Sequence, residues 1–207
     1  MRVRNLIAIT TSIALFAGTA SAYADAAKPG QSMTHMKTVA GVTSALEDLG
    51  VVLYVQGGAT AAVMGDSLST ANGQVVFHIP VTGKKGGVQH VGSNIVFFNT
   101  ANNKQVQLRN PIIDLNKGVV SAVIPQGSGE LTPVLRITNA DALKAATTND
   151  RKAQLKTKAY KGAALSLEPG IGAALNSLLG LAAGSIPENL AFATADVSLY
   201  SKLKSKK

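Results

Sequence analysis

The chain has 207 residues, a formal net charge of +9, many aliphatic residues and few aromatic ones. It contains no cysteine, which excludes a disulfide framework, a thiolate metal site and a cysteine nucleophile. The length suits one domain, and branched aliphatic residues with 20 glycines favour strands joined by turns.

The N-terminus predicts a signal peptide over residues 1–24. Two arginines precede an apolar run from Leu6 to Ala17, which is too short to span a bilayer as a stable helix. Ala22-Tyr23-Ala24 fits an A-x-A cleavage site, and Ala20-Ser21-Ala22 is a competing one. We therefore expect a secreted or cell-surface, cell-wall-associated mature protein without a transmembrane span.

The segment after the cleavage site is polar and predicts a flexible leader over residues 25–37, in which His35 would be solvated. Helical spacing of apolar residues follows in Val39–Leu49, and Val51–Gln56 is a β-branched, aromatic strand. Ala59–Met64 is either the hairpin partner of that strand or an irregular edge.

The central part of the chain, from residue 73 to residue 124, predicts a series of short strands. In Gln74–Ile79, Val75, Phe77 and Ile79 alternate with Gln74, Val76 and His78, so Phe77 faces a core and His78 lies on the exposed face. Further short strands follow at intervals of roughly ten residues, as antiparallel sandwiches and barrels show; they are Asn94–Phe98, Lys104–Arg109, Ile112–Leu115, Val119–Ile124 and Leu131–Thr138.

The C-terminal third adds helical segments to this pattern. Asn139–Thr148 contains good helix formers and predicts a short helix, and Pro169 opens an apolar helix over Gly170–Leu179. Asn149–Lys161 is basic and expected to be exposed, and Leu190–Leu199 predicts a final strand.

The predicted fold is mainly β, an antiparallel β-sandwich or flattened barrel with two or three short helices. One β-rich domain would span residues 38–199, and a basic tail would span residues 200–207.

No motif in the sequence predicts catalysis. His35, His78 and His90 lack the spacing of a metal site, and no G-x-S-x-G elbow is present. The basic, glycine-rich segment 83–87 lacks Walker spacing and is expected to be a hairpin tip. We therefore expect no catalytic residues, no metal ligands and no enzyme activity.

Three segments together resemble the exported HtaA-like β domains of actinobacteria. They are Phe77–Gly83, the His90-Val91-Gly92 turn and Val106–Asp114. The resemblance covers roughly residues 40–124 and, more loosely, residues 163–197, where the chain is similar to small secreted members of the family.

The resemblance implies haem as a ligand. Haem-binding members of the family ligate the iron with a tyrosine, and a histidine hydrogen-bonds that tyrosine. These two roles would fall to Tyr54 and His90. This chain departs from those members because it has no tryptophan. Two alternatives remain: Tyr54 is an ordinary strand tyrosine, and His90 is a hydrogen-bonding residue that stabilises its turn.

The positive charge predicts an anionic partner outside the cell, which would be a cell-wall polymer, lipid headgroups or a haem-like ligand, and not nucleic acid. The basic segments either attach the protein to such a partner or only keep it soluble. We expect an exported, non-catalytic binding or surface-associated protein. The alternative is a structural or adhesive cell-envelope protein attached through its basic surface.

Overall fold

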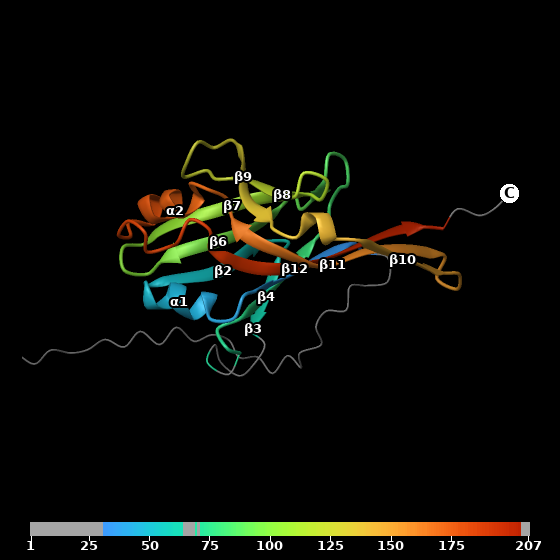
Figure 1. The fold of residues 1–207 in the computed structure, drawn as a ribbon, viewed down its shortest axis with the longest axis horizontal. Coiled ribbons are helices and arrows are strands. Elements are labelled where there is room, and N and C mark those ends of the chain that lie inside the picture. Colours follow the sequence, from blue (N-terminus) through green and yellow to red (C-terminus); the bar gives the residue numbers. More distant parts are fainter. Residues whose placement is uncertain (1–30, 64–68, 70, 204–207) are drawn as a thin grey trace, which may run out of the picture.

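The computed structural model describes residues 31–63, 69 and 71–203 (Figure 1). The expected signal peptide over residues 1–24 and residues 25–30 of the expected leader lie outside the described residues, as does the end of the basic tail. Within the described part, one antiparallel sheet curls into a nearly closed barrel accompanied by two short helices. The predicted fold class is confirmed.

The sheet follows the order β2-β6-β7-β8-β9-β11-β12-β1-β4-β3, with β5 paired to β7 and β10 paired to β11. The strands are β1 (Met33–Thr38), β2 (Val51–Gly57), β3 (Thr60–Val63), β4 (Val75–Pro80), β5 (Val88–Gln89), β6 (Ser93–Asn99), β7 (Lys104–Asp114), β8 (Val119–Val123), β9 (Leu131–Ile137), β10 (Ala145–Asp150), β11 (Leu155–Leu167) and β12 (Ala191–Lys202). The helices are α1 (Val42–Asp48), α2 (Ile171–Leu179) and the 3-10 turn η1 (Ala140–Ala142).

The core lies inside the barrel. Alternating residues of the barrel strands point inward, and Phe77, Phe97 and Phe192 are fully buried there. Both helices lie at the left end of the view in Figure 1, where Leu46 of α1 and Leu175 of α2 join the same core. Burial of this aliphatic and aromatic surface provides the main stabilisation that a chain without disulfides requires.

Several predicted boundaries are wrong. Residues 33–37 are not a flexible leader but form most of β1, which pairs with β12 and β4. β3 pairs with β4 and not with β2, so it is not the hairpin partner of β2. The domain therefore begins before residue 38, and β12 extends it to Lys202.

The helix predicted over Asn139–Thr148 is also wrong. Only the short 3-10 turn η1 forms there, and residues 145–150 become β10, which pairs along its length with β11. Cross-strand pairing with β11 overrides the helix propensity of alanine and lysine, because propensity decides little in so short a segment.

β7 runs through Asn110-Pro111, where the sequence predicted a kink between two strands. Asn110 takes a left-handed conformation with φ 50°, and the pairing with β8 shifts register between Arg109 and Ile112. This irregularity is a β-bulge, which bends the strand without ending it.

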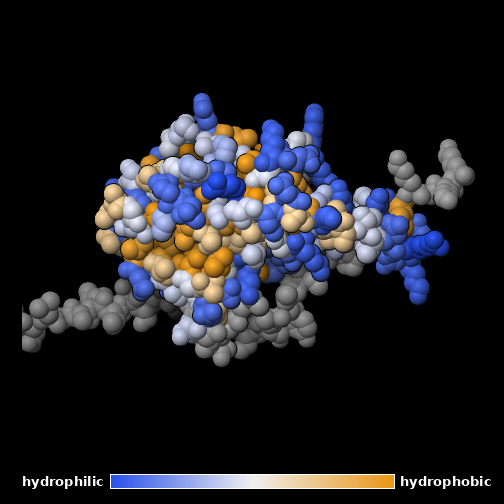
Figure 2. Space-filling view, in the orientation of Figure 1, coloured by the Kyte–Doolittle hydropathy of each residue, from blue (hydrophilic) through white to orange (hydrophobic). Residues whose placement is uncertain are grey.

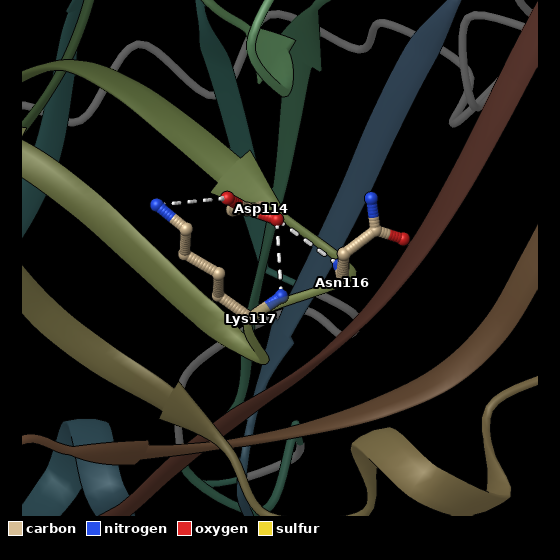
Figure 3. A network of polar contacts seen from close by, with 3 residues as sticks. All are labelled: Asp114, Asn116 and Lys117. Carbon is tan, nitrogen blue, oxygen red and sulfur yellow. Dashed lines mark hydrogen bonds and ion pairs between the residues drawn. The ribbon is translucent and has the colours of Figure 1, made fainter.

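The β7–β8 turn has the tight geometry that the sequence predicted. Asp114 Oδ1 accepts hydrogen bonds from the backbone N–H groups of Asn116 (3.1 Å) and Lys117 (3.0 Å), as Figure 3 shows. Lys117 Nζ lies 3.8 Å from Asp114 Oδ2, which is the one ion pair among the described residues. A single aspartate therefore fixes the turn through its own backbone neighbours.

The two ends of the sheet, β2 and β3, follow each other in the chain, and a close backbone contact holds the connection between them. Gly58 N–H donates to Gly92 O (2.9 Å), and Gly57 has φ +75°. A Cβ atom at Gly57 would overlap the Gly92 carbonyl oxygen, so only glycine allows the two turns to meet.

We predict that Gly57→Ala lowers the free energy of unfolding by more than about 1 kcal/mol, because alanine is strained at positive φ and would also push Gly92 away. Gly129→Ala is the matched control, since Gly129 has φ +73° but open space around its Cβ position. Urea unfolding of both variants measures the difference. An equal loss in the two would show that the close contact contributes nothing.

Candidate functional site

The His90-Val91-Gly92 turn joins β5 to β6 and meets two other segments of the chain. His90 N–H donates to Pro111 O (3.0 Å), and Gly92 N–H donates to Asn110 Oδ1 (2.8 Å). Gly92 O in turn accepts from Gly58 N–H. The turn is thus bound both to the bulge of β7 and to Gly58, which follows β2.

The imidazole of His90 is only 1% exposed, and both of its nitrogens have partners. Nδ1 lies 3.0 Å from Pro111 O, and Nε2 lies 2.8 Å from Thr34 Oγ1 on β1. Because a carbonyl oxygen only accepts, Nδ1 must carry the proton, and in the neutral ring Thr34 donates to Nε2. Burial lowers the pKa of His90, and the hydrogen bond to Pro111 O opposes this effect more weakly. The ring is therefore a neutral, fully bonded bridge between β1 and β7.

Tyr54 lies on the outer face of β2. Its neighbours Leu53 and Val55 pack against the core, so alternation directs the tyrosine outward. There its hydroxyl donates to Gln105 Oε1 on β7 at 3.2 Å. Tyr54 is thus a half-buried strand tyrosine with a satisfied hydroxyl.

The structure does not bring Tyr54 and His90 together, because they lie on opposite faces of the barrel wall. His90 lines an interior cavity of about 20 Å³ together with core residues, and Tyr54 does not line it. A cavity of this size holds about one water molecule. His90 has both ring nitrogens bonded and cannot hydrogen-bond Tyr54, so the pair does not fit the cofactor that the resemblance implies. The contacts of His90 agree with the alternative interpretation, in which this residue stabilises its turn through hydrogen bonds.

The structure instead brings together the two histidines that sequence reasoning set aside. His35 on β1 stands directly opposite His78 on β4, and their ring centroids are 4.7 Å apart. The expectation of a solvated His35 in a leader is wrong, and His78 is half-buried. Burial, and then the neighbouring His78, lower the pKa of His35, whereas Asp196 raises it. The polar, weakly alternating sequence of β1 gave little signal for this pairing.

The predicted basic segment forms a projecting arm. This arm consists of three strands: β10, the first half of β11 and the end of β12. It extends from the barrel in Figure 1, and we call it the basic arm. Residues 144–161 carry six Lys or Arg and one Asp, and all six cations are exposed. Hydrophilic residues gather at this end of the molecule in Figure 2. None of the six is ion-paired with another described residue.

The arm carries charge on both of its faces. Lys156 and Lys158 share one face of β11, and Lys158 Nζ lies 5.1 Å from the ring centre of Tyr160. Lys202 pairs with Leu155 and therefore points to the other face.

A scan against protein-family models and searches of curated proteins and of solved structures found no match to this chain. Among the described residues, no helix has the length and apolar character to cross a membrane. In the same part of the chain, no group of three or more His, Cys, Asp or Glu side chains is placed to hold a metal ion.

We predict that His90 titrates below its ordinary pKa of 6.5 in the folded protein. The unfolded chain then binds a proton more readily than the folded chain as the pH falls through 6.5, so His90 destabilises the fold on acidification. The Hε1 resonance of His90, followed by NMR in a His35→Gln/His78→Gln variant, measures this pKa directly. A midpoint at or above 6.5 would contradict it.

We also predict that Tyr54→Phe does not change the response of the protein to hemin. The Tyr54 hydroxyl is bonded to Gln105 and is remote from His90, so its loss removes no iron ligand. A Soret titration of both proteins makes the comparison. A saturable Soret shift present in the wild type and lost in Tyr54→Phe would restore the tyrosine as a haem ligand.

Proposed function

We propose that this chain is exported and acts as a non-catalytic binding protein that attaches to an anionic cell-wall polymer through its basic arm. The observation that carries the proposal is the arm itself, whose six Lys and Arg residues against one Asp project from the barrel without ion pairs to other described residues. Unneutralised positive charge of this density attracts polyanions.

The distribution of charge favours a polymer over a flat anionic surface. Lys156 and Lys158 on one face and Lys202 on the other cannot all meet a plane, whereas a flexible polyanion can follow both faces. Exposed lysine side chains also adapt to irregularly spaced charges, because each is a compact charge on a flexible stem.

Two other observations support a binding role. The N-terminal segment has the order of charge, apolar run and small residues that signal peptides share. His90, the most buried histidine, has both ring nitrogens hydrogen-bonded within the fold, so neither is free to exchange a proton with a substrate. The resemblance to HtaA-like domains stays a prediction, and the haem role attached to Tyr54 and His90 is not part of this proposal.

The alternative of a structural or adhesive envelope role would use the same arm. It differs only in that attachment through the arm would be the whole function.

We predict that neutralising the arm weakens binding to isolated cell walls and to polyphosphate. The test variant is Lys152→Gln/Lys156→Gln/Lys158→Gln, and the control with the same charge change is Lys85→Gln/Lys104→Gln/Arg136→Gln. We expect the test variant to bind at least about tenfold more weakly and with a shallower salt dependence, and the control to lose much less, because screened charges act locally.

The outcomes separate the alternatives. Equal losses in the two variants would show that net charge, and not the arm, controls binding. Binding to anionic phospholipid vesicles as strong as binding to the polymers would replace the polymer with a membrane surface. Binding that does not change with salt would contradict electrostatic attachment.

A further inference from the structure

A row of three ionisable side chains crosses the outer face of the barrel. Asp196 on β12 is directly opposite His35 on β1, and His35 is directly opposite His78 on β4. Directly opposed residues of antiparallel strands point to the same face, with Cβ atoms about 4.5–5.5 Å apart. Thr34 and Phe77, which precede the two histidines, are buried on the inside, so the row faces outward.

The two imidazoles have unused nitrogen atoms. Their rings are in edge-to-face contact with an interplanar angle of 80°, and no other described residue forms a hydrogen bond with either ring. His78 Nδ1 is buried without any partner. A buried polar atom without a protein partner is uncommon, so this nitrogen is open to a ligand or a water molecule. His90 differs in this respect, because both of its ring nitrogens are bonded within the fold.

The carboxylate of Asp196 is held in position beside the pair. Its Oδ1 accepts a hydrogen bond of 2.7 Å from Gly162 N–H, so the backbone of β11 orients the group. The side chain is exposed, and Oδ2 has no hydrogen bond to another described residue. Lys37, two positions along β1 on the same face, adds a positive charge beside the row and weakens cation binding there.

From this geometry we propose that His35 and His78 bind a divalent transition-metal ion on the outer face of the barrel, with the Asp196 carboxylate supplying negative charge beside it. Imidazole nitrogens are ligands for Zn²⁺, Cu²⁺ and Ni²⁺ at metal–nitrogen distances of about 2.0–2.1 Å. The Cβ atoms of His35 and His78 are close enough for both imidazole rings, after side-chain rotation, to bind the same ion. Two protein nitrogens leave the other coordination positions to water, so the site is open and exchangeable.

The proposal predicts an order of metals. Affinity for a site with nitrogen ligands rises to Cu²⁺ and falls at Zn²⁺, whereas Mg²⁺ and Ca²⁺ require oxygen ligands. The untagged chain should therefore bind one Cu²⁺ most tightly, Zn²⁺ and Ni²⁺ more weakly, and Mg²⁺ not at all. The site is independent of the basic arm and of the function proposed for it.

Isothermal titration of the untagged chain with Cu²⁺ and Zn²⁺ tests the site. We expect His35→Gln and His78→Gln each to weaken binding at least about tenfold, and Asp196→Asn to weaken it less. The double variant His35→Gln/His78→Gln keeps His90 as its only histidine, so it should bind no ion at this affinity. Tyr54→Phe is a control, because Tyr54 lies elsewhere on the outer face, on β2. This variant should bind the metal ions as the wild type does.

Electron paramagnetic resonance of the Cu²⁺-loaded wild type provides a second measurement that needs no variant to fold. Hyperfine splitting from two imidazole nitrogens is expected. Splitting from one nitrogen or none, absence of binding in the wild type, or unchanged affinity in the double variant would each overturn the proposal.

Discussion

The buried bridge from Thr34 through His90 to Pro111 is the contact on which the arrangement of the barrel depends. It joins β1, the turn before β6 and the bulge of β7 through one side chain. An imidazole in an apolar interior is tolerated only when both nitrogens are bonded, and here each partner comes from a different strand. The polar ring therefore specifies how these strands meet, which the aliphatic residues around it cannot do alone.

Two buried amides act in the same way near α2. Asn176 exchanges two hydrogen bonds with the backbone of Ile186, and Asn99 Nδ2 donates to Leu179 O. The chain has no cysteine, so these side chains hold the loops and the helix on the barrel without covalent links. Apolar burial supplies most of the stabilisation, and the few buried polar groups fix the relative positions of the elements.

The three histidines illustrate what sequence can predict. Alternation in Gln74–Ile79 placed Phe77 inward and His78 outward, and the strand β4 confirms this, because the pattern is local. The meeting of His35 and His78 could not be predicted, since it depends on which strands become neighbours in the sheet. The His90-Val91-Gly92 motif marked His90 as a candidate site residue. Its hydrogen bonds to Thr34 and Pro111, which the sequence does not reveal, show that it links two strands.

The errors in secondary structure have the same origin. Residues 33–38 are too polar to resemble a strand, and they become one because β12 and β4 lie on either side. Residues 142–146 contain good helix formers, and yet residues 145–150 become a strand because β11 extends beyond the barrel and pairs with them. In both segments, pairing with distant residues outweighs the local preference.

The pairing of β1 with β12 also constrains the order of folding. Met33 is opposite Ser198, so the first and last strands of the described chain are neighbours within the sheet. That ladder cannot form until almost the whole chain has been synthesised, and contacts so distant in sequence slow folding. One edge of β1 thus stays unpaired during synthesis, although its other edge can pair with β4 earlier. Late completion of the sheet suits a chain that, as proposed here, passes through a membrane before it folds.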